Sequence, residues 1–311
     1  MQNNERPLVS ICCITYNHEP YIRDCLEGFV MQRTNFPFEV LIHDDASTDR
    51  TADIIREYEA KYPDIIKPIY QTENQYSRGK SIWGEFQFPF ARGKYIALCE
   101  GDDFWTDPRK LQIQYDYMEA HPECSLCFHR VNVLFDNSSQ DVPLFKQIEE
   151  RDYSFEDAKI PTCSVFFRNM EERSHLGQLL SGTNIKLAFG DVFVWGIMSQ
   201  YGTLHALSRS MATYRKHQGG VTCTKEWGTD ISLVETWLYF LQCVPSKFQF
   251  VKKTISGNIK RQIWLMLKHK QNSAHAIHAL VYHSLGGRKA FEVYSYCFFS
   301  GICNVIRKIG R

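Results

Sequence analysis

The first hundred residues alternate between two hydrophobic patterns, and this alternation restricts the fold more than any other feature of the sequence. Residues 8–15 form a continuous apolar run, typical of a strand buried on both faces. Apolar residues then recur at helical spacing over residues 22–30, and the same pair of patterns follows at 38–43 and 54–62. Strands that alternate with helices in this way predict a parallel sheet with helices on its faces.

Two acidic clusters stand where two of the predicted strands end. Asp44 and Asp45 follow the second of these strands, and Glu100, Asp102 and Asp103 follow another strand expected over residues 94–99. Asp107 as N-cap and Pro108 at the first helical position then predict the start of a helix. Parallel sheets bind ligands at the carboxyl ends of their strands, so one crevice can hold both clusters. Carboxylate oxygens are the ligands that Mg²⁺ and Mn²⁺ prefer, although an Asp pair of this kind also caps turns that face water.

The alternation becomes looser in the second half of the chain. Residues 124–135 and 162–168 have the pattern of strands, with a helix expected between them, and residues 204–214 form another strand-like run. The remainder is helical in pattern. We therefore expect an α/β domain over residues 1–225 and a basic, mainly helical extension over residues 226–311.

Several segments together are similar to a known family. PLVSICCITYNHEPYIRDCLEGFVMQ, FEVLIHDDASTDRTADII and ARGKYIALCEGDDFWTDPRKLQ, followed later by GDVFVWGIMSQYG and YRKHQGGV, resemble the family 2 glycosyltransferases over about residues 7–222. The resemblance implies the fold called GT-A, a nucleotide-sugar-binding sheet flanked by helices. It also implies transfer with inversion of the anomeric centre, as in most members.

The resemblance assigns a nucleotide pocket to residues near the first two strands. Thr15, Tyr16 and Asp45 should line it, with Tyr16 packed on the base and Asp45 accepting a hydrogen bond from a ring N–H of the base. Arg78 is expected to face the base or the diphosphate. The alternatives are a core or rim tyrosine for Tyr16, an N-cap for Asp45 and a solvated loop arginine for Arg78.

The family's metal motif, Asp-x-Asp, aligns with Glu100-Gly101-Asp102-Asp103, so Glu replaces the first Asp. The resemblance implies that Asp102 contacts both the donor and the metal, Mn²⁺ or Mg²⁺, with Asp103 as the second metal ligand. Glu100 is expected to reach the ribose or a metal-bound water. His217, in YRKHQGGV, is expected at the metal or the diphosphate, and an ordinary loop histidine is the alternative.

Transfer with inversion needs one base to take the proton of the acceptor hydroxyl. In related enzymes this base is an acidic residue at the start of a helix in the second half of the domain. Asp191 occupies that place in the sequence, and the resemblance therefore implies that it is the catalytic base. An Asp that follows Gly at a helix start is also an ordinary N-cap, which is the alternative.

Charge is distributed unevenly along the chain. The overall net charge of +1 argues against a protein that coats nucleic acid, yet residues 246–311 carry a net +11 and residues 1–245 a net −10. The basic segment either contacts the inner face of the cytoplasmic membrane or packs on the acidic body. A start without a signal-peptide pattern and 11 cysteines without framework spacing predict a cytoplasmic protein with reduced thiols.

These observations lead to a metal-dependent, inverting glycosyltransferase. We expect it to move a sugar from a nucleotide diphosphate, with UDP favoured, to a hydroxyl of a glycan or lipid-linked acceptor in cell-surface polysaccharide or lipopolysaccharide synthesis. A non-catalytic nucleotide-sugar-binding or scaffold subunit is the alternative, disfavoured because the acids at Asp102, Asp103 and Asp191 are intact. A nucleotidyltransferase is disfavoured because no Gly-rich phosphate loop follows the first strand.

Overall fold

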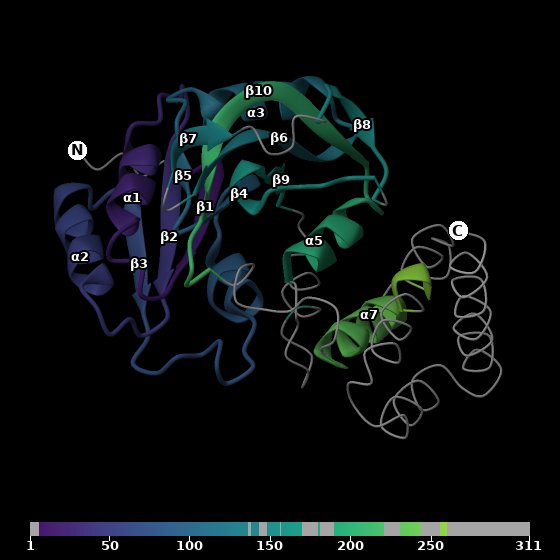
Figure 1. Ribbon diagram of the computed structural model, residues 1–311. Coiled ribbons are helices and arrows are strands. Elements are labelled where there is room, and N and C mark those ends of the chain that lie inside the picture. Colours follow the sequence, from purple (N-terminus) through teal and green to yellow (C-terminus); the bar gives the residue numbers. More distant parts are fainter. Residues whose placement is uncertain are drawn as a thin grey trace. The chain divides into compact units, whose positions relative to one another are not determined.

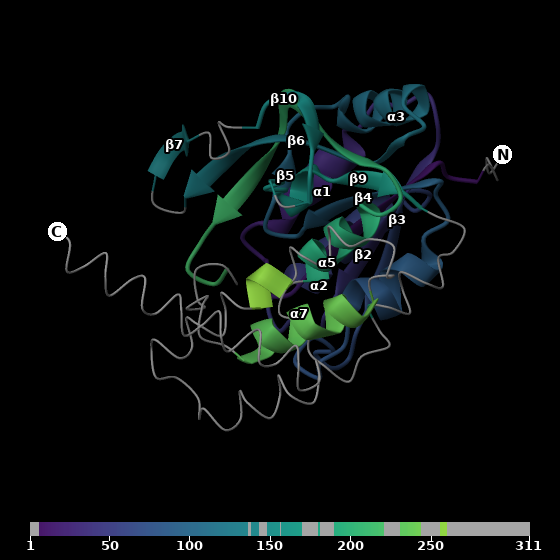
Figure 2. The ribbon, with the colours of Figure 1, turned by 90° about the vertical axis from the view of Figure 1, so that its right-hand side faces the viewer.

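The structure is a computed structural model, shown in two views in Figures 1 and 2. It describes residues 6–135, 138–142, 148–155, 157–169, 180, 190–220, 231–243 and 256–259. The chain forms two compact units. The first contains residues 1–183 and 194–223, and the second contains residues 184–193 and 224–311.

The first unit is built on one mixed sheet, whose strands run in the order β3-β2-β1-β4-β9-β6-β10-β5. Strands β3, β2, β1 and β4 are parallel, which confirms the prediction for the first half of the chain, while β9 is antiparallel to β4 and β6. Figure 2 shows the two long strands β6 and β10 side by side. The strand bounds are β1 Val9–Thr15, β2 Phe38–Asp44, β3 Ile66–Tyr70, β4 Tyr95–Glu100, β5 Phe104–Trp105, β6 Cys124–Phe135, β7 Ser138–Val142, β8 Arg151–Tyr153, β9 Phe166–Arg168 and β10 Thr203–Lys216.

The helices of the first unit follow from the sheet connections. Because β1-to-β2 and β2-to-β3 are consecutive right-handed crossovers, α1 (Ile22–Val30) and α2 (Thr51–Lys61) lie side by side on one face of the sheet (Figure 1). The apolar stripe of α1 is buried, and its Phe29 packs edge-on against Trp105 with ring centroids 4.8 Å apart. The other elements are α3 (Lys110–Ala120), a π-helix η1 (Ile82–Gln87) and two 3₁₀ turns, η2 (Phe88–Phe90) and η3 (Thr162–Ser164).

Two local expectations were wrong. The sequence Asp107-Pro108 is typical of a helix start, but α3 begins at Lys110. One Asp107 oxygen accepts the Arg109 N–H in a turn that precedes the helix, and the other pairs with Arg209 at 2.6 Å. In place of the helix expected after residue 135, the described residues form the short strands β7 and β8.

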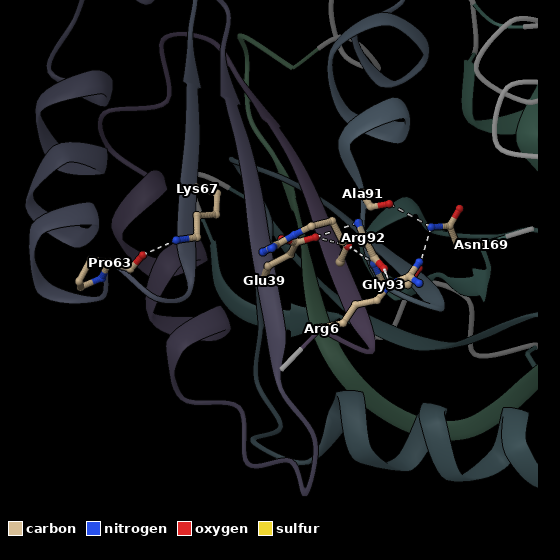
Figure 3. A network of polar contacts seen from close by, with 9 residues as sticks. Arg6, Glu39, Pro63, Lys67, Ala91, Arg92, Gly93 and Asn169 are labelled. Carbon is tan, nitrogen blue, oxygen red and sulfur yellow. Dashed lines mark hydrogen bonds and ion pairs between the residues drawn. The ribbon is translucent and has the colours of Figure 1, made fainter. Parts of the chain in front are cut away.

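A buried carboxylate, Glu39 of β2, connects the amino ends of neighbouring strands (Figure 3). Its oxygens accept the hydroxyl of Ser10 on β1 at 2.7 Å, the backbone N–H of Arg92 at 2.9 Å and the Arg92 guanidinium at 2.6 and 2.8 Å. Asn169, which follows β9, donates to the Gly93 carbonyl at 2.7 Å. Strands β1, β2 and β4 are thus fastened together at their amino ends, and the antiparallel strand β9 is joined to them at its carboxyl end.

The second unit is helical where it is described. It contains α7 (Ile231–Cys243) and residues 190–193, the first part of α5 (Gly190–Met198). Phe193 packs against Phe240 and Tyr239 of α7, with ring centroids 4.6 and 5.8 Å apart. The basic segment lies outside the described residues except for a helical stretch at 256–259. Among the helices that the structure describes, none is long and apolar enough to cross a membrane.

Candidate active site

The carboxyl ends of three parallel strands meet at one place on the sheet. The pairing register sets Thr15 at the end of β1 opposite Asp44 at the end of β2, and sets Ile14 opposite Glu100 at the end of β4. Both acidic clusters therefore lie at the same edge, as predicted. This is the edge at which a parallel sheet binds its ligands.

Two residues in left-handed backbone conformation shape the loops at this edge. Asn17, after β1, has φ of 53°, and Ala46, after β2, has φ of 61°. The Asn17 N–H donates to the Ser47 hydroxyl at 2.9 Å, and its side-chain oxygen accepts the Thr48 N–H at 2.8 Å. The two loops therefore hold one another in conformations that cost a non-glycine residue free energy.

Thr15, Tyr16 and Asp45 lie together at this edge. Thr15 is buried, and within the described part of the chain its hydroxyl has no hydrogen-bond partner. Tyr16 is 42% exposed, so its ring is available for packing on a flat ligand. Asp45 is buried, and its backbone N–H donates to the Thr15 carbonyl at 3.0 Å.

The Asp45 carboxylate has partners that the sequence did not indicate. Its two oxygens accept the backbone N–H groups of Gln75 and Tyr76 at 2.7 and 3.0 Å, which fixes the loop after β3 against the end of β2. Each carboxylate oxygen has a further lone pair for a ligand. Arg78 of the same loop is exposed and paired with Glu73.

Glu100, Asp102 and Asp103 form a compact acidic group, with one oxygen of each within 4.8 Å of the others. Asp103 is fully buried; one oxygen accepts the Arg215 N–H at 2.8 Å, and the other has no partner in the described part of the chain. Burial, reinforced by the charges of Asp102 and Glu100, raises the pKa of Asp103 well above its ordinary value. A buried carboxyl group with two further carboxyl groups beside it is suited to a cation, whose positive charge offsets theirs.

His217 lies directly beside Asp102, with Nε2 3.0 Å from Oδ2 of the carboxylate. Burial alone would raise the pKa of Asp102, but the hydrogen bond with His217 and the charge of His18 outweigh it, so the pKa lies below its ordinary value. The structure thus brings together the two residues that the resemblance implied for a metal, although they are 115 positions apart in the sequence.

Arg215, two residues before His217, holds this arrangement in place. Its guanidinium donates to the Asp102 carbonyl and to the Asp24 carboxylate, both at 2.9 Å. It also lies over the rings of Tyr21 and Phe104, 4.8 and 5.0 Å from their centroids. The end of β10 is therefore joined to α1 and to the acidic loop by one buried side chain.

His18 is a member of the site that the sequence analysis missed. One of its ring nitrogens lies within 4.8 Å of ligand atoms of Asp102 and His217, and the two histidine rings are perpendicular with centroids 6.2 Å apart. Burial lowers the pKa of His18 despite the opposing charge of Asp102. The available signal was its place immediately after the first buried strand, opposite the acidic loop.

The residues at this edge fit a divalent cation. Three buried polar atoms around the acidic loop have no hydrogen-bond partner within the described residues: the Thr15 hydroxyl, His18 Nδ1 and Asp103 Oδ2. Buried polar groups are normally paired, so a buried cluster of unpaired donors and acceptors is suited to hold a ligand. The donor set around Asp102, carboxylates and imidazoles, is one that binds divalent metal ions.

Asp191 lies in the first turn of α5, in the part of the helix that belongs to the second unit. Burial raises the pKa of Asp191, although hydrogen bonds from the Val192 and Asp191 backbone N–H groups oppose the shift. A carboxylate with a raised pKa is a stronger base than an ordinary surface Asp.

Gly101, between the acids, has no room for a side chain. A Cβ there would lie 2.6 Å from the Thr15 hydroxyl oxygen and 2.9 Å from His18 Nδ1. We expect Gly101→Ala to destabilise the fold by about 1–3 kcal/mol through overpacking and to displace both neighbours. Urea unfolding measures this. Gly257→Ala is the matched control, because a Cβ there meets nothing within 4 Å; equal effects of the two variants would contradict the steric argument.

Known proteins resemble this chain in sequence. Residues 10–174, more than half of the chain, match the family model described as glycosyl transferase family 2. An uncharacterized protein of Mycobacterium tuberculosis (strain ATCC 25618 / H37Rv) is 38% identical over 223 residues, which cover 68% of this chain and 60% of the relative. The protein named "Putative teichuronic acid biosynthesis glycosyltransferase TuaG" of Bacillus subtilis (strain 168) is 26% identical over 272 residues, which cover 87% of this chain and 97% of the relative.

Two solved structures share the fold. S. aureus TarS 1-349 in complex with UDP-GlcNAc superposes with a TM-score of 0.59 at 16% identity, covering 89% of this chain and 79% of that one. The mannosyltransferase PcManGT from Pyrobaculum calidifontis, in complex with GDP-Man and Mn²⁺, does so with a TM-score of 0.50 at 16% identity, covering 97% and 88%. At this identity the likeness bears on the fold alone, and it confirms the predicted α/β fold of GT-A type.

Proposed function

Because the chain belongs to glycosyl transferase family 2, we propose that it transfers a sugar, with inversion, from a nucleotide-diphosphate sugar to a hydroxyl of a glycan or lipid-linked acceptor. One observation carries the proposal: the carboxyl ends of β1, β2 and β4 gather a buried cluster of acids and histidines beside an exposed tyrosine. Such a cluster can bind a diphosphate together with a metal ion, and the tyrosine can pack on the nucleobase of the same donor.

In this proposal the donor lies across the loops after β1 and β2. Tyr16 packs on the base, and Asp45 accepts a base N–H with an oxygen that also holds the loop at residues 75–76. The Thr15 hydroxyl, unpaired among the described residues, bonds the nucleotide. Arg78 turns from Glu73 toward the base or the diphosphate, and Glu100 bonds the ribose or a metal-bound water.

The diphosphate lies at the acidic loop. Asp102 and His217 would hold Mn²⁺ or Mg²⁺, with Asp103 as the second carboxylate. When bound there, the cation would supply positive charge to offset the charge of the diphosphate leaving group. Arg215 keeps the Asp102 backbone in position, so the carboxylate is set before the donor arrives.

Asp191 takes the proton of the acceptor hydroxyl as that oxygen attacks the anomeric carbon and the bond from that carbon to the diphosphate breaks. The new bond forms on the face opposite the leaving group, which inverts the anomeric centre. The rival proposal, a subunit that binds nucleotide sugars without catalysis, needs the donor loops but has no use for a base with a raised pKa.

The acceptor in this proposal is a growing cell-surface polysaccharide or lipopolysaccharide at the inner face of the cytoplasmic membrane. The name of TuaG supports a polysaccharide, and the net charge of +11 over residues 246–311 supports a meeting with anionic lipid. The UDP-GlcNAc and GDP-Man bound by the two structural relatives support a nucleotide-diphosphate donor, of which we favour a UDP-sugar.

The proposal predicts a metal-dependent gain in stability with one nucleotide. Melting temperatures measured with UDP, GDP, dTDP and CMP, each with and without Mn²⁺, should show a rise for one diphosphate only when Mn²⁺ is present. A ligand at 100 times its dissociation constant stabilises the fold by about 2.7 kcal/mol, which is several degrees.

The matched variants remove one carboxylate each. Asp102→Asn should abolish the rise, whereas Asp116→Asn, which changes an exposed residue of α3 that bonds only Gln112 among the described residues, should keep it. If no nucleotide raises the melting temperature, the proposed donor site is contradicted. A rise without product formation from the matching nucleotide sugars and glycan acceptors would favour the non-catalytic subunit.

A further inference from the structure

We propose that His18 is a protein ligand of the divalent cation together with Asp102 and His217, and that this pair of imidazoles makes the site select Mn²⁺ over Mg²⁺. The inference rests on the proposed function, to which it adds a ligand and a metal preference. It assigns a role to a residue that neither the sequence pattern nor the relatives' names single out.

The three side chains already have the spacing of a ligand set. Asp102 Oδ2 and His217 Nε2 are 3.0 Å apart. Two ligands at right angles, each about 2.1 Å from a metal, are separated by about 3.0 Å. A ring nitrogen of His18 lies within 4.8 Å of both atoms, so a small rotation of the ring brings it into the same shell.

The chain fixes His18 in this position. Its backbone N–H donates to the Thr51 hydroxyl at 2.8 Å, and that hydroxyl in turn donates to Asp49 at 2.6 Å. The ring lies against Gly101, where a Cβ would be 2.9 Å from Nδ1. Nδ1 has no hydrogen-bond partner among the described residues although it is buried. A histidine held this tightly without a partner is prepared for a ligand that the protein does not itself supply.

The acidic loop offers a second set of ligands that shares Asp102, formed with Glu100 and Asp103. That set contains only oxygen, which suits Mg²⁺, whereas imidazole nitrogen suits transition metals better. Asp103 is fully buried, and one of its oxygens is taken by the Arg215 N–H. The set with His18 and His217 adds two imidazoles to the shared carboxylate, so the two sets predict opposite metal preferences.

Metal binding to the full chain without nucleotide tests the inference. Free Mn²⁺ is measured by its solution electron paramagnetic resonance signal during titration, and Mg²⁺ by competition. Three protein ligands predict that Mn²⁺ binds the protein alone and more tightly than Mg²⁺. His18→Ala should weaken Mn²⁺ binding at least about tenfold, an effect known even for groups outside a metal's ligand shell. It should change Mg²⁺ binding much less, so the preference collapses.

Matched variants separate His18 from general effects. His18→Asn keeps a polar side chain of similar reach and should also lose the preference. His121→Ala removes a histidine near the start of β6, at the opposite end of the sheet, and should bind Mn²⁺ like the wild type. In pulsed resonance spectra with ¹⁵N-histidine, the nitrogen couplings to Mn²⁺ should fall from two histidines to one in His18→Ala.

The outcomes distinguish the inference from the function beneath it. Unchanged Mn²⁺ affinity and couplings in His18→Ala, with binding lost in Asp102→Ala, would overturn the role of His18 and leave the metal-dependent transferase standing. Binding of Mn²⁺ only when nucleotide is present would also overturn the three-ligand set, while still supporting the donor site. No metal binding under either condition would remove the metal from the proposed function as well.

Discussion

Replacing Asp191 with Asn should reduce sugar transfer by about 10²–10⁴-fold while leaving binding of the nucleotide sugar unchanged. The amide keeps the shape of the carboxylate and can still accept the Val192 N–H, so α5 keeps its first turn. It cannot take a proton from the acceptor. Steady-state rates, together with donor binding by calorimetry, measure the two effects separately.

The pH dependence of the transfer rate tests the role of Asp191 in a second way. The base works when it is deprotonated, and burial raises the pKa of Asp191 above its ordinary value. Transfer should therefore fall with decreasing pH at a pH higher than for an ordinary Asp. Asp116→Asn should leave both rate and profile unchanged. A loss of less than about tenfold in Asp191→Asn would place the base elsewhere.

The folded chain should become markedly less stable above about pH 8.5. Burial raises the pKa of six thiols above the ordinary value, to about 12 for Cys99 and about 11 for Cys124. The others, for which the direction is the same, are Cys12, Cys25, Cys127 and Cys163. The folded state keeps these protons at a pH where the unfolded chain releases them, so stability falls as pH rises.

The size of this effect follows from linkage. At pH 9.5 each thiol costs about 1.4 kcal/mol relative to neutral pH, because an exposed thiol has a pKa of about 8.5. Lys110 acts in the opposite direction, because burial lowers its pKa to about 8 in the folded chain. The folded chain therefore releases this proton at a lower pH than the unfolded chain does. By pH 9.5 this difference raises the free energy of unfolding by about 2 kcal/mol. The sum is a net loss of several kcal/mol, which urea unfolding in a reducing buffer at pH 7.0 and 9.5 measures.

Cys12→Ala is the matched variant for the thiols. It leaves a cavity whose cost is the same at both pH values, so only the difference between them changes, by about 1.4 kcal/mol. Stability that is constant or increasing between pH 7.0 and 9.5 in the wild type would contradict a core of protonated thiols.

The sequence predicted the parts of the fold that depend on local pattern. The apolar runs at β1, β2 and β4 are buried on both faces and the stripe of α1 is covered, as their spacing indicated. The start of α3 was predicted two residues too early: Asp107 accepts the Arg109 N–H, but in a turn that precedes the helix. Strand β9 is a three-residue insertion between β4 and β6, and its pairing depends on contacts distant in sequence.

The candidate site shows the same division. The strand ends indicated where Asp45 and the acidic loop would lie, since parallel strands finish at one edge. The sequence did not show that the amides of Gln75 and Tyr76 bond Asp45, nor that His18 faces Asp102. Both contacts depend on the path of a loop, and the spacing of apolar residues along the sequence does not predict that path.

The hydrogen bonds and the ion pair of Glu39 have a consequence for protein engineering. The buried Glu39 carboxylate, paired with the exposed Arg92 guanidinium and bonded by the Ser10 hydroxyl, fastens the amino ends of the strands, and the loops of the candidate site extend from the carboxyl ends. The sheet should therefore keep its structure when the loops after β1, β2 and β3 are replaced by the corresponding loops of a relative. If these loops bind the donor as proposed, a chimera cut there would bind the relative's sugar nucleotide, while the strands that position the grafted loops would remain those of this chain.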